Sequence, residues 1–176
     1  MESAIFAGGC FWCTEAVFNI LRGIISAKPG YTGGTVANPT YEEVSSEKTG
    51  HAEAIRIEFN PDEISYKDLL TVFFASHDPT QLNRQGSDIG EQYRSAIFYV
   101  DEEQKEKAEE YIDEMKRGGI PVVTKLEEFT KFYEAEDYHK NYFEKNKNER
   151  YSRVIISPKL EKIQRKFQDL LKEKRK

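Results

Sequence analysis

Residues 4–15, Ala4-Ile5-Phe6-Ala7-Gly8-Gly9-Cys10-Phe11-Trp12-Cys13-Thr14-Glu15, decide the fold class, because they join a short apolar strand to a helix through two glycines. The strand is expected over residues 4–7. The helix is expected over residues 10–22, with Glu15 in its first turn and Gly23 at its C-terminal end. A cysteine therefore lies at the joint between a strand and a helix.

The same alternation continues along the chain. Strands are predicted over residues 51–59, 95–100 and 122–126. A capping box formed by Ser65 and Asp68 opens a helix that runs through residue 76. Another helix starts at Asp101 with Gln104 and ends at the glycine pair 118–119, and one of its faces carries Ala108, Tyr111, Ile112 and Met115. We therefore expect one α/β or α+β domain that comprises residues 1–176.

Two segments do not follow this alternation of strand and helix, and the C-terminal segment is distinguished by its basic charge. Residues 28–46 and 77–94 show no periodicity, and we expect ordered functional loops there, because their apolar and aromatic content exceeds that of disordered segments. Residues 158–174 predict an amphipathic C-terminal helix. Its basic residues could form a nucleic-acid-binding arm, but we favour a helix packed by its apolar face, formed by Leu160, Ile163, Phe167, Leu170 and Leu171.

Composition excludes several classes of protein. The 176 residues carry a net charge of −5, 38% are hydrophobic and 32% are charged. No apolar run approaches the ~18 residues that a membrane span needs, and the first residues do not resemble a signal peptide. We therefore expect a cytoplasmic protein that binds neither membranes nor nucleic acid. In a reducing compartment, two close cysteines are more often catalytic or metal-binding than structural.

Cys10 and Cys13 are the candidate reactive groups. A thiolate at a helix N-terminus faces free backbone N–H groups, so we expect a lowered pKa and a nucleophilic Cys10. Cys13 lies one turn further along and could form a reversible disulfide with Cys10 after a small relaxation of that turn. The alternatives are two buried cysteines that act as small hydrophobes, or a zinc site. We expect no metal, because the three histidines are scattered and a closed zinc site needs four ligands.

Glu53 is the candidate acid. The period of two in residues 51–59 places it on the same face as Ile55, Ile57 and Phe59, which is the face expected to be buried. Burial raises the pKa of a carboxyl group and keeps it able to donate a proton at neutral pH. The alternative is a glutamate near the strand end whose carboxyl group reaches water.

Eight blocks of sequence together resemble the type A peptide methionine sulfoxide reductases. The blocks follow one order, and the resemblance spans roughly residues 4–145. They are Gly-Cys-Phe-Trp-Cys at 9–13, Gly-Tyr-Thr-Gly-Gly at 30–34, Asn-Pro-Thr-Tyr at 38–41, Thr-Gly-His-Ala-Glu at 49–53, His-Asp-Pro at 77–79, Arg-Gln-Gly-Ser-Asp at 84–88, Gln-Tyr-Arg-Ser at 92–95 and Ala-Glu-Asp-Tyr-His at 135–139. The resemblance implies reduction of methionine-S-sulfoxide, free or in proteins, and hence repair of oxidised proteins. It also implies a two-layer scaffold with a ferredoxin-like core, long functional loops and a C-terminal helix.

The resemblance also implies a role for each residue of the site. Cys10 would attack the sulfoxide sulfur and become a sulfenic acid, and Glu53 would protonate the departing oxygen. The remaining roles are hydrogen bonds to that oxygen from Tyr41 and Tyr93, an apolar pocket for the S-methyl group from Phe11 and Trp12, and orientation of substrate or water by Asp88.

The chain departs from a common form of the family in one respect. Many relatives carry resolving cysteines near the C-terminus, and some have Tyr-Cys where this chain has Tyr151-Ser152. Cys13 is the only other cysteine in the sequence and is therefore the resolving candidate, with thioredoxin or a dithiol as external reductant and no bound cofactor. The alternatives are a general Cys-x-x-Cys thiol–disulfide oxidoreductase and a non-catalytic binding module.

Overall fold

A six-stranded sheet in the order β7-β6-β1-β3-β2-β8 forms the centre of the computed structural model, which describes residues 1–173. All neighbouring strands are antiparallel except β6 and β7. A two-stranded ribbon lies apart from this sheet. The strands are β1 (Glu2–Gly8), β2 (Ile24–Thr32), β3 (Ala52–Phe59), β4 (Arg84–Gln85), β5 (Asp88–Ile89), β6 (Ser95–Tyr99), β7 (Lys125–Glu128) and β8 (Phe132–Glu134).

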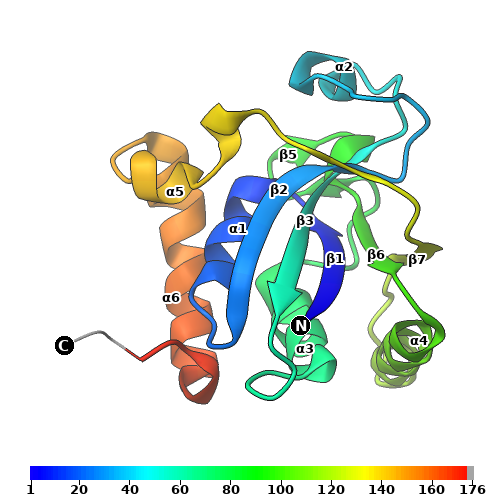
Figure 1. Ribbon diagram of the computed structural model, residues 1–176, viewed down its shortest axis with the longest axis vertical. Coiled ribbons are helices and arrows are strands. Elements are labelled where there is room, and N and C mark those ends of the chain that lie inside the picture. Colours follow the sequence, from blue (N-terminus) through cyan, green and yellow to red (C-terminus); the bar gives the residue numbers. More distant parts are fainter. Residues whose placement is uncertain (174–176) are drawn as a thin grey trace.

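In Figure 1 the helices lie behind, beside and above the central strands. The α-helices are α1 (Phe11–Asn19), α2 (Tyr41–Ser45), α3 (Tyr66–Ser76), α4 (Glu102–Arg117), α5 (Tyr142–Lys145) and α6 (Ser157–Lys166). A π-helical turn, Ser152–Ile156, leads directly into α6, and short 3₁₀ turns occupy Glu91–Tyr93, Asp137–His139 and Gln168–Leu170.

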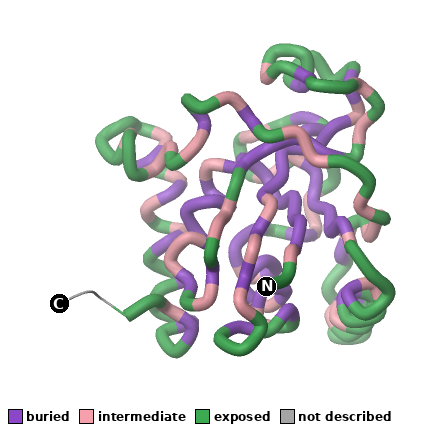
Figure 2. Tube along the Cα trace, viewed as in Figure 1, coloured by how far each residue is buried: buried purple, intermediate pink, exposed green. Residues whose placement is uncertain are grey.

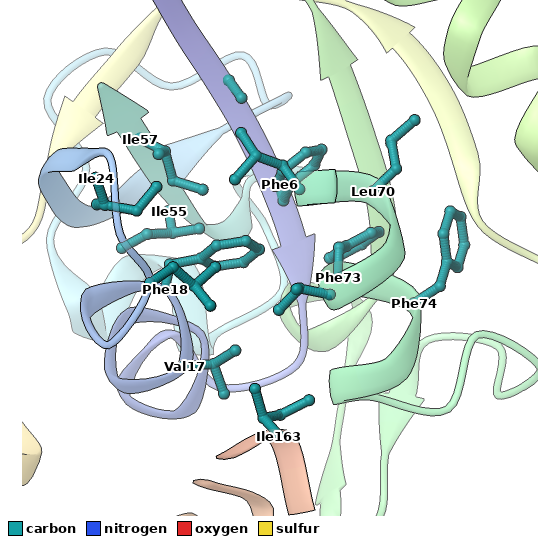
Figure 3. Packing of buried hydrophobic residues seen from close by; sticks show 14 of the residues in the cluster. Phe6, Val17, Phe18, Ile24, Ile55, Ile57, Leu70, Phe73, Phe74 and Ile163 are labelled. Carbon is teal, nitrogen blue, oxygen red and sulfur yellow. The ribbon is translucent and has the colours of Figure 1, made fainter. Parts of the chain in front are cut away.

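The main core fills the space between one sheet face and helices α1, α3 and α6. Phe6 of β1 lies at its centre, stacked on Phe18 of α1 at 5.7 Å and on Phe73 of α3 at 4.8 Å between ring centroids. Ile163 of α6 is fully buried in the same cluster. Figure 3 shows these side chains converging from the sheet and from three helices. Burial of this apolar area is the main force that holds the helices to the sheet.

The opposite face of the sheet has a smaller core. Ile5, Ala54 and Phe98 are buried there, and Phe129 and Phe132 pack against them from the segment around β7 and β8. Figure 2 shows the buried residues concentrated in the central strands and many exposed ones on α4 and α2. The central strands are therefore covered on both faces, which makes β1 and β3 rigid supports for the residues at their ends.

Most of the predicted elements are confirmed. The strands at residues 4–7, 51–59 and 95–100 correspond to β1, β3 and β6. The capping box forms as predicted, with Ser65 Oγ accepting from Asp68 N at 3.0 Å and Asp68 Oδ2 accepting from Ser65 N at 3.0 Å. Asp101 Oδ1 accepts from Gln104 N at 2.8 Å at the start of α4.

Several predicted boundaries are wrong. Helix α1 ends at Asn19 rather than at residue 22, and Glu15 lies beyond its first turn. The last predicted strand lies at residues 125–128 instead of 122–126. Residues 28–32 of the first predicted loop belong to strand β2, which was not expected, and residues 41–45 form α2. Residues 77–94 are a structured connection that holds β4, β5 and a 3₁₀ turn.

The C-terminal helix is shorter than predicted. It spans Ser157–Lys166 instead of residues 158–174, and residue 174 lies outside the described residues. The chain leaves the helix at Phe167 and makes a 3₁₀ turn, so that the predicted apolar face is shared by two elements. Leu160, Ile163, Phe167 and Leu170 are nevertheless buried, which confirms the packed face. Within residues 1–173, no helix is long and apolar enough to cross a membrane.

Candidate active site

Cys10 lies between strand β1 and helix α1, as the sequence predicted. It occupies the N-cap position of α1, with extended backbone angles and no side-chain capping bond. Its carbonyl oxygen accepts from Cys13 N at 3.1 Å and from Thr14 N at 3.4 Å, so the first turn is tightened towards 3₁₀ geometry. Both thiols are free and buried, with exposed fractions of 8% for Cys10 and 2% for Cys13.

Gly9 allows the sharp turn that presents Cys10. Its φ of +90° lies in the region that side chains of L-residues rarely adopt. A Cβ atom at this position would also lie 2.8 Å from the side chain of Gln85. The turn therefore requires glycine both for its backbone conformation and for the close approach of the 77–94 segment.

Glu53 lies at the start of β3 and is 1% exposed, which rules out the alternative in which its carboxyl group reaches water. Its Oε1 accepts from Phe11 N at 3.3 Å and its Oε2 accepts from Gln92 Nε2 at 3.5 Å. Burial raises the pKa of Glu53 to about 8, although the bonds from Phe11 and Gln92 oppose the shift. The direction of this shift is the predicted one, and it favours a protonated carboxyl group at neutral pH.

The expectation of a lowered pKa for Cys10 is wrong. Burial, followed by the charge of Glu53, raises the pKa of the Cys10 thiol well above its ordinary value, and the backbone N–H of Trp12 only partly opposes this. Desolvation thus shifts the pKa of Cys10 more than the helix N-terminus does. The contribution of Glu53 disappears when that carboxyl group is protonated, so the two groups influence each other's ionisation.

Tyr41 and Tyr93 converge on the same place from different elements. Tyr41 is the first residue of α2 and Tyr93 ends the 3₁₀ turn before β6. Burial raises the pKa of both phenols, and the nearby charges of Glu53 and Cys10 raise both further. Both hydroxyls are therefore protonated hydrogen-bond donors at neutral pH, close to the carboxyl and thiol groups.

Aromatic side chains form the wall beside Cys10. Trp12 is half-buried, and Tyr142 stacks on its ring at 3.7 Å with an interplanar angle of 6°. Its Nε1 donates to His139 Nδ1 at 3.0 Å. Phe11 is 1% exposed and packs against Tyr31 and His139, so it lies beneath this wall.

Glu136 connects this aromatic wall to Tyr31 and Tyr41. Its Oε2 accepts from Tyr31 OH at 3.0 Å, and its Oε1 accepts from Tyr41 N at 3.1 Å. Its Oε2 also lies 3.4 Å from His139 Nε2. Burial lowers the pKa of His139, so the neutral ring accepts from Trp12 at one nitrogen and faces Glu136 with the other.

Asp88 and Cys13 are joined by Tyr151. Tyr151 OH donates to Asp88 Oδ2 at 2.7 Å and lies 3.7 Å from Cys13 Sγ. A cavity of about 80 Å³ adjoins these groups and is lined by both cysteines, Asp88, Tyr151 and Lys159 among others. Asp88 therefore lies beside both thiols, as a site residue should.

The structure thus brings all eight predicted site residues together, and it adds several that the sequence did not reveal. Gln92, Glu136 and His139 fell within the blocks of resemblance, but nothing in the sequence assigned them a role. Tyr151 was noted only as the residue before Ser152, where some relatives have Tyr-Cys, and Lys159 had no signal. Both come from the C-terminal segment. Within residues 1–173, no three His, Cys, Asp or Glu side chains are grouped as metal ligands.

Known proteins resemble this chain over nearly its whole length. A family profile described as "Peptide methionine sulfoxide reductase" matches residues 2–171. The "Peptide methionine sulfoxide reductase MsrA" of Saccharolobus solfataricus is 55% identical over 173 residues, which are 98% of each chain. The crystal structure of Mxr1 from Saccharomyces cerevisiae in reduced form is 33% identical with a TM-score of 0.78, and the match covers 84% of this chain and 87% of that one. Mxr1 in complex with Trx2 matches with a TM-score of 0.54 at 25% identity, over 80% and 84% of the two chains.

Proposed function

Because the chain belongs to the peptide methionine sulfoxide reductase family, it reduces methionine sulfoxide, and we propose that Cys10 is the nucleophile and Glu53 the acid of this reaction. One observation supports this assignment above the others. The Glu53 carboxyl group has a pKa of about 8 and lies at the N-terminus of the helix that Cys10 caps. A group that must donate a proton is thus held protonated beside the group that must attack.

The proposed chemistry balances at these two residues. The Cys10 sulfur attacks the sulfoxide sulfur while the Glu53 proton is transferred to the sulfoxide oxygen, which is a poor leaving group without it. Methionine leaves, and the oxygen remains on Cys10 as a sulfenic acid. The Tyr41 and Tyr93 hydroxyls would donate hydrogen bonds to the sulfoxide oxygen, and Asp88 would orient substrate or water.

Trp12 and Phe11 are proposed to form the apolar pocket for the S-methyl group. Trp12 is half-buried and fixed by a hydrogen bond and by ring stacking, so it offers a rigid apolar surface next to Cys10. A fixed wall on one side and hydroxyl donors on the other would distinguish the two epimers. We therefore propose methionine-S-sulfoxide, free or in proteins, as the substrate.

Recycling is proposed to run through Cys13. Its thiol would attack the sulfenic acid on Cys10, and thioredoxin or a dithiol would reduce the resulting disulfide. The similar Mxr1 structure in complex with Trx2 supports thioredoxin as the partner. The proposal requires no bound cofactor, no metal, no nucleic acid and no membrane. A general thiol–disulfide oxidoreductase would not need a protonated Glu53.

The order of strands supports a ferredoxin-like core. The four strands β6-β1-β3-β2 are antiparallel, and α1 and α3 follow β1 and β3 in the chain. We infer that this unit is the ferredoxin-like core of one reductase domain over residues 1–176, which acts in the cytoplasm.

The decisive experiment supplies each methionine sulfoxide epimer, first with a dithiol and then with thioredoxin and its reductase. Methionine should form from the S-epimer alone. Cys10→Ser should abolish the reaction, because an alcohol is no comparable nucleophile at neutral pH. Cys13→Ser should still release one methionine per enzyme but should cycle poorly with thioredoxin. Turnover by Cys10→Ser would remove Cys10 from the mechanism, and normal thioredoxin-dependent cycling of Cys13→Ser would remove Cys13.

A further inference from the structure

We propose that Tyr151 is a catalytic residue of the resolving step, in which it carries the proton of the Cys13 thiol to Asp88 while Cys13 attacks the sulfenic acid on Cys10. This inference rests on the proposed function, in which Cys13 is the resolving thiol. It adds a role for a residue to which the sequence assigned none.

The direction of the hydrogen bonds carries the argument. Tyr151 OH donates its single proton to Asp88 Oδ2 at 2.7 Å. Its oxygen is therefore left to accept, and Cys13 Sγ, at 3.7 Å, is the group that can donate to it. The three groups form a directed chain from the thiol through the hydroxyl to the carboxylate. A thiol held in this way can lose its proton without contact with bulk water.

The need for such a chain follows from the burial of Cys13. Its side chain is 2% exposed, and a buried thiol resists ionisation, although only the thiolate attacks sulfur well. Burial raises the pKa of Cys13, and the charge of Lys159 is the largest influence that lowers it. Lys159 lines the same cavity as the two thiols, so a cation lies near the place where the thiolate must form.

The atoms balance along this route. The S–H bond of Cys13 breaks, and its proton moves to the Tyr151 oxygen while the Tyr151 proton moves to Asp88. The new S–S bond forms as the S–O bond of the Cys10 sulfenic acid breaks. Asp88 lines the cavity beside Cys10, so the same proton can pass to the departing hydroxide, which leaves as water. The Cys13 sulfur is oxidised, the sulfenic sulfur is reduced, and no outside reagent is consumed.

The position of Tyr151 is otherwise that of a packing residue. Its ring meets the Trp12 ring edge-on at 5.6 Å between centroids, and Tyr142 stacks on the same indole. This pair supplies a matched comparison, because both tyrosines contact Trp12 but only the Tyr151 hydroxyl contacts a thiol. Tyr151→Phe removes the relay and retains the ring, whereas Tyr142→Phe removes a hydroxyl that has no part in it.

The experiment measures two rates in one reaction. Reduced enzyme is mixed with one equivalent of methionine-S-sulfoxide without reductant, quenched at set times, and treated with a 1,3-dione that traps sulfenic acid. Released methionine reports the first step, and mass mapping of the Cys10–Cys13 disulfide against the trapped sulfenic acid reports the second. The ratio of the second rate to the first is the quantity compared among variants.

The proposal predicts that Tyr151→Phe lowers this ratio about 10²-fold or more, the lower end of what removal of an acid–base group costs. The ratio in Tyr142→Phe should stay within twofold of the parent. Asp88→Asn should lower the ratio similarly, and the double variant should lose no more than either single one, because residues that act in one chain are not additive.

Three outcomes overturn the proposal. One is a ratio in Tyr151→Phe within twofold of the parent, another is an equal loss in Tyr142→Phe, and the third is additive losses in the double variant. Failure of the proposed function itself would look different. The parent would then show no Cys10–Cys13 disulfide, or Cys13→Ser would cycle normally with thioredoxin.

Discussion

The backbone N–H of Phe11 donates to Glu53 Oε1 at 3.3 Å, so a carboxyl group from strand β3 caps the helix that begins after Cys10. The N-cap side chain makes no capping bond of its own, and Glu53 takes that part. The same contact fixes the carboxyl group beside the thiol. One hydrogen bond therefore contributes both to the start of the helix and to the geometry of the reaction.

Replacing Glu53 by Gln should retain this hydrogen bond and remove the transferable proton. We expect single-turnover methionine formation to fall about 10²–10⁴-fold. In the parent, the rate should also fall as the pH rises through about 8, because Glu53 loses its proton there. The variant should lack that alkaline decline. A rate within twofold of the parent, or an unchanged alkaline decline, would place the acid elsewhere.

The bond from Trp12 to His139 should govern substrate binding. His139→Leu leaves the indole N–H without its acceptor, which costs about 1–3 kcal/mol, so we expect the KM to rise roughly fivefold or more with a smaller change in kcat. His139→Asn supplies an oxygen near the position of Nδ1 and should recover much of the loss. Trp12 is the only tryptophan in the sequence, so its fluorescence emission should shift in the leucine variant and return in the asparagine variant. An unshifted emission in the leucine variant would contradict the role of His139.

Glu15 should make the stability of the protein depend on pH. It is 3% exposed, its Oε2 accepts from Asn141 N at 3.1 Å, and burial raises its pKa to about 7. A raised pKa means that the folded state binds this proton more tightly than the unfolded state does, so protonation stabilises the fold. This contribution to the free energy of unfolding is complete below about pH 4.5 and is lost as the pH rises through about 7. Glu15→Gln should therefore gain up to about 3 kcal/mol in free energy of unfolding, relative to the parent, between pH 5 and pH 8.

Urea unfolding at the two pH values measures this difference. Glu109→Gln, on the exposed side of α4, is the control and should show no such gain. If the parent and Glu15→Gln keep a constant difference from pH 5 to pH 8, the Glu15 carboxyl group is ionised at both values and the prediction is wrong.

Ser65→Ala should destabilise the protein by about 1 kcal/mol, because it removes the acceptor of the Asp68 N–H at the start of α3. Thr71→Ala is the comparison within the same helix. Its hydroxyl donates only to the Lys67 carbonyl, one turn back, so its loss should cost little. Equal losses in the two variants, measured by denaturant unfolding, would contradict a specific capping effect.

The strand–helix joint at Cys10 and the buried face of Glu53 could be predicted because both depend on local pattern. The period of two in β3 and the two glycines before Cys10 lie within a few residues of the feature that they determine. Strand β2 was missed for the opposite reason. Its Pro29 and Gly30 are typical of loops, but Gly30 is needed because a side chain there would collide with Phe132 of β8, more than a hundred residues away.

The residues that support the site could not be predicted either, because they are far in sequence from the residues that they contact. His139 bonds to Trp12 across 127 positions, and Tyr151 contacts Cys13 across 138. No local pattern can indicate such partners. The prediction of a lowered pKa for Cys10 was wrong for a related reason. The burial that raises this pKa comes from elements that pack around Cys10 only in the folded chain.

The two thiols lie on one turn of α1, while helix α6 is held in the main core by Leu160 and Ile163. Because a Cys10–Cys13 disulfide would form within this one turn, the C-terminal segment does not need to move during the catalytic cycle. Amide hydrogens of α6 should therefore exchange with deuterium at the same slow rate in the reduced and the disulfide forms, and a C-terminal tether to a solid support should leave the catalytic cycle intact.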